Sequence, residues 1–373
     1  MTMRAREIKR DEELPIIKKS VSFSNLSIMT PMKGVKSANL KKYDKDDRKG
    51  SGCMINEISK HIDSDTLDGI YGTEGFSLGI CRDIKERYSP DSVNFVFFNL
   101  KGTKFPNENL TNSLGHVLYS ASDKVVCLPS IQKAFLLSPS TSGKSQKIDE
   151  RKIDDYLIFQ KRIIDAVNVR NSKEILGIIP LLVPKYTRKI VDLYIENEIF
   201  NYVIDAGTAN ILNKEPDLRS ILGHISRQAK EHKRSLAETY IHAINLGINQ
   251  FSADEVSADD FLSLFAYIDT FGTTFKTRGN FVKNAKPRSK VFLPDRYTYR
   301  LTDKMPKDDL PEDIKTGAYP KLSLFNEKRQ VAEAVNVREM IGQEGMKSYV
   351  KSKAISDVTY GKLANIFSRV KVD

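Results

Sequence analysis

Two aspartates lie where apolar segments of strand length end, and a carboxylate held there can do chemistry. Asp205 closes the apolar run Tyr202–Ile204, and Asp269 lies beside Thr270 in the segment Tyr267–Phe275. A carboxylate in such a place can attack an electrophilic carbon or transfer a proton. Each aspartate also has a structural interpretation, as a helix cap or a turn residue. Asp205 is preferred, because its strand is the better defined.

A run of cations with interleaved phenylalanines is the second feature with chemical meaning. It follows the expected strand near residue 269 and suits contact with phosphates and bases. A solvated lysine-rich loop is the alternative interpretation. His242, inside an apolar strand, is predicted to be a packed core histidine rather than a functional group. The candidate nucleic-acid-binding residues are Lys276, Arg278, Lys283, Lys286, Arg288 and Lys290.

Composition favours a polyanionic partner. The 373 residues carry a formal net charge of +11, with a pI of about 9.2, and such an excess is typical of nucleic-acid-binding proteins. A soluble lysine-rich surface is the alternative. The three cysteines (Cys53, Cys81 and Cys127) form no CxxC pair, so we expect a reducing compartment, no zinc and no cofactor. Since no apolar run reaches membrane-span length and the N-terminus lacks a signal-peptide core, a cytoplasmic location is expected.

The elements that would position these residues alternate between strands and helices. In Glu174–Ile211 a strand, a helix and a second strand follow one another, which predicts parallel strands. Further apolar runs recur, and a (β/α)8 TIM-like barrel is favoured over an open sheet. Ile55–Ile62 is interpreted as a short helix. The predicted barrel strands are 93–99, 124–128, 175–181, 201–205 and 239–246, with another near 269.

The expected domain organisation has three parts. Residues 1–20 form a flexible N-terminus, and 21–350 form the barrel domain. Within that domain a hairpin around Ser24-Asn25 comes first, and a basic irregular segment covers 276–320. A C-terminal helical region follows from about Glu327, and 351–373 form a tail or helix.

Several segments match one known family in order and spacing. They are the hairpin entering Thr30-Pro31, the run LGIIPLLVPKYTRKIVDLYIENEIFNYVIDAG from Leu176, YIHAINLG from Tyr240, Asp269–Gly272 with Thr277-Arg278, and LSLFNEKRQVAEAVNVREMI from Leu322. Together they resemble the tRNA-guanine transglycosylases and their DNA-modifying relatives. Those enzymes are TIM barrels that exchange a guanine for a 7-deazaguanine base. The resemblance implies a barrel fold and action on nucleic acid.

The chain departs from this family at the positions that matter most. The family's nucleophilic aspartate would fall on Gly272, which cannot attack a ribose carbon. The family's first aspartate would fall in the segment NLKGTK, from Asn99 to Lys104. Asn99 can hydrogen-bond a base there but cannot accept a proton as a carboxylate does. The zinc ligands of the family have no counterpart here. Candidate substrate-binding residues are Gly102, Lys104, Gly207 and Gly272. For Gly102 and Gly272 the reason is that a flat base can approach their backbone, with simple turn geometry as the alternative.

Three functions remain open on these grounds. The first is a divergent guanine transglycosylase-like enzyme acting on tRNA or DNA, with Asp205, Asp269 and Asn99 as catalytic candidates. The second is a catalytically degenerate nucleic-acid-binding subunit of the same fold that partners an active enzyme. For the chain itself, both a homodimer and a heterodimer are open. The third is a TIM-barrel enzyme acting on a small phosphorylated substrate.

Overall fold

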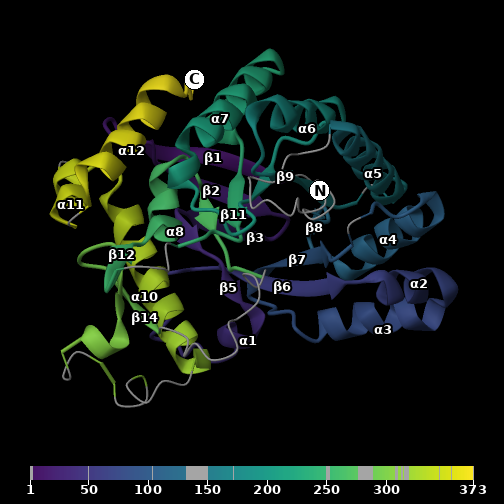
Figure 1. The fold of residues 1–373 in the computed structure, drawn as a ribbon, viewed down its shortest axis with the longest axis horizontal. Coiled ribbons are helices and arrows are strands. Elements are labelled where there is room, and N and C mark those ends of the chain that lie inside the picture. Colours follow the sequence, from purple (N-terminus) through teal and green to yellow (C-terminus); the bar gives the residue numbers. More distant parts are fainter. Residues whose placement is uncertain are drawn as a thin grey trace, which may run out of the picture.

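The centre of the molecule is a parallel sheet with the strand order β4-β13-β11-β10-β9-β8. The computed structural model describes residues 3–372 apart from 49, 103, 132–149, 171, 249–252, 276–288, 307–309, 312–313, 315–318, 344 and 354. The sheet and the helices that flank it make an α/β fold (Figure 1). Its strands are β4 (Met32–Lys33), β8 (Val125–Cys127), β9 (Glu174–Pro180), β10 (Tyr202–Asp205), β11 (Ile241–Ile244) and β13 (Thr270–Phe271).

The strands predicted within 124–128, 175–181, 201–205 and 239–246 are confirmed as β8, β9, β10 and β11. Each is parallel to the next, as the crossover in Glu174–Ile211 predicts. Their side chains are buried on both faces; Val203 and Ile204, for example, are each 0% exposed. Unbroken apolar runs are the pattern that such doubly covered strands need.

A second parallel sheet adjoins the first. It consists of β5 (Val35–Lys36), β6 (Met54–Ile62) and β7 (Ser92–Leu100), so the strand predicted at 93–99 is also confirmed. Only Gly34 separates β4 from β5. On the other side, the Leu100 N–H donates to the carbonyl of Ser130 at 2.8 Å, and the Ser130 N–H donates to that of Phe98 at 3.0 Å. The chain at Gly34 and these two hydrogen bonds of Ser130 therefore connect the two sheets.

The expected helix at Ile55–Ile62 is wrong, because these residues form most of β6. The apolar residues Ile55, Ile58 and Ile62 have helical spacing, but Asn56 and Glu57 between them are also buried. Asn56 donates to the side chain of Asn94 on β7 at 2.7 Å. Polar residues on the buried part of a strand remove the apolar signal by which strands are recognised.

Helices follow most of the parallel strands and cover their outer faces (Figure 1). Local signals set several starts: Asp63 accepts from the Thr66 N–H, Asn107 accepts from the Leu110 N–H, and Pro184 opens α6. The helices are α1 (Ser37–Leu40), α2 (Ser64–Gly72), α3 (Glu74–Lys85), α4 (Glu108–Ala121), α5 (Glu150–Asn168), α6 (Pro184–Glu196), α7 (Glu215–Glu231) and α8 (Asp259–Leu262). Short 3-10 turns lie at Leu212–Lys214, Leu236–Glu238, Ser263–Phe265 and Thr302–Lys304.

The N-terminal residues form an antiparallel sheet instead of the flexible segment expected for 1–20. It contains β1 (Arg4–Arg10), β2 (Ile17–Phe23) and β3 (Leu26–Thr30), and the hairpin turn between β2 and β3 is Ser24-Asn25. The strand β1 is rich in charge, and its sequence suggested a frayed end. Charged residues are common on edge strands, where they discourage pairing with other molecules.

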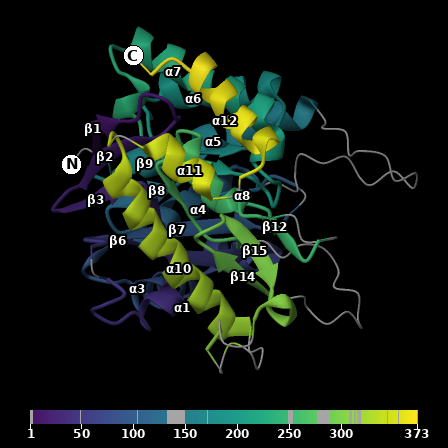
Figure 2. The ribbon, with the colours of Figure 1, turned by 90° about the vertical axis from the view of Figure 1, so that its left-hand side faces the viewer.

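The C-terminal part packs a long helix against a small antiparallel sheet. The strands are β12 (Glu255–Ser257), β14 (Lys290–Leu293) and β15 (Thr298–Leu301), so the segment 276–320 is not irregular throughout; 276–288 lie outside the described residues. Figure 2 shows α10 (Tyr319–Met340) running beside β14 and β15. The helices α11 (Met346–Ser352) and α12 (Asp357–Arg369) complete the chain. Among the described residues, no helix has the length and apolar character needed to cross a membrane.

Candidate active site

Asp205 ends β10, and its carboxylate is held by three donors. The hydroxyl of Ser130 donates to Oδ2 at 2.5 Å, the Gly207 N–H donates to Oδ1 at 3.0 Å, and the side-chain amide of Asn245 donates to Oδ1 at 2.8 Å. The carboxylate is 0% exposed. These donors replace the water that burial removes, so a carboxylate is stabilised at the carboxyl end of the strand.

A second buried carboxylate comes from β6. Oε1 of Glu57 lies 2.9 Å from Nε2 of His242 on β11, and both side chains are 0% exposed. The two atoms are close, but neither has hydrogen-bond geometry with the other. Oε2 of Glu57 accepts from the N–H of Thr273 at 2.8 Å and from its hydroxyl at 2.6 Å. The carboxylate of Glu57 on β6 and the imidazole of His242 on β11 therefore face each other in the buried interior.

The surroundings of Glu57 keep it ionised. Burial by itself would raise its pKa, but His242, Lys33 and Thr273 together outweigh that effect and lower the pKa to about 2. Two glycines make room for the carboxylate. A Cβ at Gly272 would lie 1.9 Å from Oε1, and one at Gly34 would lie 2.3 Å from it. The absence of a side chain at both positions is what allows Glu57 to occupy this space.

His242 is oriented from its other side by a hydroxyl. Its Nδ1 lies 2.7 Å from the hydroxyl of Thr270, which is also 2.6 Å from the hydroxyl of Tyr240. The ring of Phe97 is stacked on the imidazole, and Phe275 lies against Phe97 with ring centroids 5.4 Å apart. The imidazole is 0% exposed and is fixed by a hydrogen bond and a ring stack, so the expectation of a packed core histidine is confirmed.

Asn245 and Thr273 link the two carboxylates. While the side-chain amide of Asn245 donates to Asp205, its side-chain carbonyl accepts from the N–H of Phe275 at 2.8 Å. The backbone N–H of Asn245 donates to the carbonyl of Thr273 at 3.2 Å, and Thr273 in turn holds Glu57. One hydrogen-bonded chain thus joins Asp205 to Glu57 through the segments that follow β11 and β13.

The other candidates near β7 and β10 lie at the same edge. The side-chain amide of Asn99 donates to the hydroxyl of Ser59 at 2.9 Å, and the residue is 4% exposed. Gly102 and Lys104 follow β7 and are exposed. Gly207 has a φ of 60°, a conformation suited to glycine, and contributes its N–H to Asp205. Of these residues, Gly207 contacts Asp205 directly.

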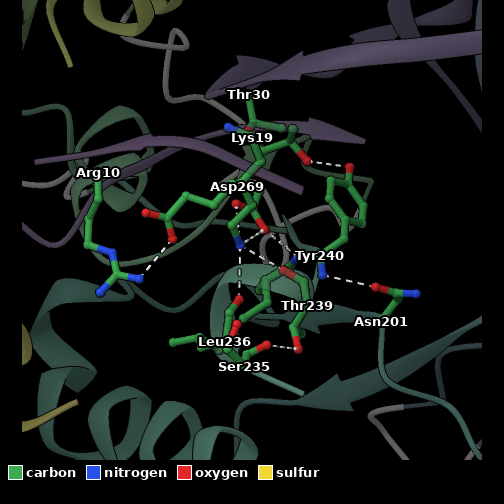
Figure 3. A network of polar contacts seen from close by, with 12 residues as sticks. Arg10, Lys19, Thr30, Asn201, Ser235, Leu236, Thr239, Tyr240 and Asp269 are labelled. Atoms are coloured by element: carbon green, nitrogen blue, oxygen red, sulfur yellow. Dashed lines mark hydrogen bonds and ion pairs between the residues drawn. The ribbon is translucent and has the colours of Figure 1, made fainter. Parts of the chain in front are cut away.

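The structure does not bring Asp269 to this site. Asp269 precedes β13 and accepts from the N–H of Ile241, the first residue of β11, so it lies at the amino ends of the strands. Its carboxylate is bound 2.9 Å from Nζ of Lys19, which also donates to the carbonyls of Leu236 and Thr239 (Figure 3). This arrangement fixes the N-terminal sheet to the central one and makes Asp269 a structural residue.

The candidate nucleic-acid-binding residues lie almost entirely outside the described residues. This applies to Lys276, Arg278, Lys283, Lys286 and Arg288. Lys290 is described, and the structure does not suit it to phosphate contact: it lies in β14, is 7% exposed and points its Nζ toward the carbonyl of Ala253 at 3.4 Å. Its role is therefore structural.

Three residues of the site are missed by sequence reasoning: Glu57, Ser130 and Asn245. Glu57 is hidden in a segment that looks helical, and Ser130 follows Pro129 after a short strand. Asn245 lies in an apolar run and has a φ of 55°. Glu57 and His242 are polar residues inside buried strands, and Ser130 and Asn245 are polar residues that follow apolar strands; a polar residue in or next to such a strand points to a buried partner.

The described residues contain no group of three or more His, Cys, Asp or Glu side chains arranged to hold a metal ion. The three cysteines are all free thiols. Comparison with protein-family models gives no match, and no curated protein matches the chain at a significant level.

Proposed function

We propose that the chain is a guanine transglycosylase-like enzyme whose two parallel sheets close into one (β/α)8 barrel. Two features support closure: the single glycine between β4 and β5, and, on the opposite side, the bridge of Ser130 with Asn99, whose hydrogen bonds join Ser130 to Phe98 and Leu100. In this barrel β4 with β5, β6, β7, β8, β9, β10, β11 and β13 follow one another around the ring. The carboxyl ends of the strands then surround a single site, as in other barrels of this type.

The observation that carries the proposal is the pair of buried carboxylates joined through Asn245 and Thr273. Asp205 is the proposed nucleophile: one of its oxygens bonds to C1′ of a nucleotide, and the electron pair of the glycosidic bond leaves with the guanine. His242, whose Nε2 lies 2.9 Å from Oε1 of Glu57, is the proposed donor of the proton that the leaving base takes up. The incoming 7-deazaguanine returns a proton to His242, its nitrogen bonds to C1′, and the carboxylate is released.

The substrate is proposed to be a guanine in tRNA or DNA. The net charge of +11 favours a phosphate backbone as partner. A base that reacts inside a barrel must leave its stack, and a site between strand ends can receive it. The cations between 276 and 288 are proposed to contact phosphates.

A base-exchange assay tests this function. Labelled guanine or labelled 7-deazaguanine is incubated with the protein and with tRNA or duplex DNA, and incorporation is counted. Asp205→Asn retains the shape and removes the charge, so it is expected to abolish exchange and leave binding nearly intact. Asp83→Asn, on the exposed face of α3, is the matched control and is expected to remain active. An active Asp205→Asn variant would contradict the assignment of the nucleophile.

A binding subunit without catalysis is the second candidate, and one observation favours it. Asp205, Glu57 and His242 are each no more than 2% exposed, and hydrogen bonds or ion pairs already engage them. A protein that binds nucleic acid with a steep salt dependence but exchanges no base, alone or with a partner subunit, would fit this function. Lys286→Ala combined with Arg288→Ala is expected to weaken binding and flatten the salt dependence under either proposal.

A further inference from the structure

A cavity of about 370 Å³ lies between residues 104–106, which lead into α4, and residues 152–162 of α5. The helices α4 and α5 run side by side (Figure 1). Lys104, a candidate substrate-binding residue, is part of the lining of the cavity, whereas Asp205, Glu57 and His242 are not. Its volume falls within the usual range for small-molecule sites. The lining residues are Lys104, Phe105, Pro106, Lys152, Asp155, Ile158, Phe159 and Arg162.

The charge of the lining favours an anion. Three of the lining side chains are cations and one, Asp155, is a carboxylate. Arg162 is held by Glu108 on α4, with Nη2 2.9 Å from Oε2, so its position is fixed across the two helices. Lys104 reaches the cavity from the segment after β7, and Lys152 reaches it from α5. Cations that come from separate elements and face one cavity provide a site for a phosphate group.

The remaining lining is apolar and partly open to solvent. The ring of Phe105 is packed against Tyr156 and Phe159, with centroids 6.1 and 5.9 Å away, so its orientation is fixed. Ile158 is 52% exposed, although it lines the cavity. Exposed apolar surface next to cations suits a ligand with a flat apolar part and an anionic part. A nucleotide has both parts, since its base can lie on apolar side chains and its phosphate can contact the lysines.

The cavity lies at the same edge of the sheet as Asp205. Lys104 and Phe105 follow the carboxyl end of β7, and α5 begins beside the start of α6, where Glu150 and Lys185 are 2.5 Å apart. We propose that this cavity binds a nucleotide of the nucleic-acid substrate that flanks the exchanged one. The inference rests on the proposed function, and it adds a second region of phosphate binding to the one expected for 276–288.

Binding of a fluorescein-labelled single-stranded oligonucleotide, followed by fluorescence anisotropy at several salt concentrations, tests the proposal. Lys104→Ala combined with Lys152→Ala is expected to weaken binding about tenfold and to reduce the salt slope by about 1.4, or about 0.7 for each phosphate that the protein no longer neutralises. Ile158→Ala is expected to weaken binding a few-fold with an unchanged slope, because it removes only apolar surface. Circular dichroism and thermal melting verify that each variant is folded.

The matched control removes the same charge from the other end of the strands. Lys85 and Lys230 are exposed near the ends of α3 and α7, and Lys85→Ala combined with Lys230→Ala is expected to bind as the wild type does. If both double variants weaken oligonucleotide binding equally, the cavity is not a binding site, even if base exchange is intact. If only the cavity variants lose binding and the protein exchanges no base, nucleotide binding in the cavity is supported and the proposed base-exchange activity is refuted.

Discussion

The carboxylate of Glu57 occupies the space in which a side chain at position 272 would lie. A Cβ built on Gly272 would be 1.9 Å from Oε1 of Glu57 and 2.8 Å from Nε2 of His242. Position 272 is where the resemblance to the guanine transglycosylases places a nucleophilic aspartate, and the chain has glycine there. A carboxylate from β6 thus fills the volume that a side chain from the segment after β13 would otherwise take. The two positions are coupled sterically, and this coupling can be measured.

Gly272→Ala is therefore expected to destabilise the protein by roughly 1–3 kcal/mol, because the new methyl group overlaps Glu57. In a Glu57→Ala background the same change is expected to cost much less, since the overlapping atoms are gone. Urea unfolding of the four proteins of this cycle gives the coupling free energy. Gly79→Ala on α3 is the control: a Cβ there meets nothing within 4 Å, and alanine is the better helix former. Additive effects of the two changes would contradict the overlap.

The lowered pKa of Glu57 predicts a pH dependence of stability. Its pKa is about 2 in the folded protein, against an ordinary value of 4.5, so the unfolded chain binds this proton first as the pH falls. The stabilisation is fully present above about pH 4.5 and is lost as the pH falls toward 2. At 1.36 kcal/mol per pKa unit it amounts to about 3 kcal/mol. Urea unfolding from pH 2 to 7 is expected to show this loss of unfolding free energy at acid pH in the wild type. The same loss is expected in Glu86→Gln, an exposed control. A Glu57→Gln variant that loses as much unfolding free energy at acid pH as the wild type would show that Glu57 is not its cause.

Sequence patterns predict much of this fold because most of the parallel strands are apolar on both faces. β8, β9, β10 and β11 are recognisable for that reason, and Asp205 is placed correctly at the end of its strand. β6 is missed because buried polar residues interrupt it, and Glu57 is missed with it. Such residues are stabilised by partners on strands far away in the chain, which local patterns do not contain.

The position of Asp269 shows a different limit. The segment Tyr267–Phe275 is apolar enough to suggest one strand, but Tyr267 has a φ of 56° and β13 begins only at Thr270. A shift of a few residues in the start of a strand moves a side chain from one end of the sheet to the other. Sequence patterns show where a strand lies more accurately than where it begins and ends. A site built at strand ends depends on those boundaries.

Glu327 on α10 predicts a pH dependence of the opposite sign. The residue is 4% exposed, Oε1 has no hydrogen-bond partner among the described residues, and burial raises its pKa to about 7. The stabilisation from the neutral acid is fully present below about pH 4.5 and is lost as the pH rises through 7, by up to about 3 kcal/mol. Glu327→Gln is expected to remove this loss and to be more stable than the wild type at pH 8. Glu339→Gln, exposed on the same helix, is expected to retain the wild-type profile. If the free energy of unfolding varies with pH in the same way for Glu327→Gln and the wild type between pH 5 and 8, the pKa of Glu327 is not raised.

The last prediction concerns the buried pair at the amino ends of the strands. Lys19 is 1% exposed, and its ammonium is bound by Asp269 and by the carbonyls of Leu236 and Thr239 (Figure 3). Lys19→Met leaves the carboxylate of Asp269 buried without its counter-charge, which is expected to cost about 3–5 kcal/mol. Removing both charges, in Lys19→Met combined with Asp269→Leu, is expected to restore part of that loss. The restoration is incomplete because the Ile241 N–H then has no side-chain acceptor.

The neighbouring residue supplies the control for this prediction. Lys18 points to the other face of β2 and pairs with Glu339, whose side chain is 62% exposed, at 3.3 Å. Because solvent screens that pair, Lys18→Met is expected to change the free energy of unfolding by no more than about 1 kcal/mol. Urea unfolding at pH 7 compares the variants. If Lys19→Met and Lys18→Met are equally stable, the Lys19–Asp269 pair does not hold the N-terminal sheet in place. If Lys19→Met is selectively destabilised and the double variant recovers, Asp269 acts in the fold, and Asp205 is the one of the two aspartates chosen from the sequence that stays a candidate for chemistry.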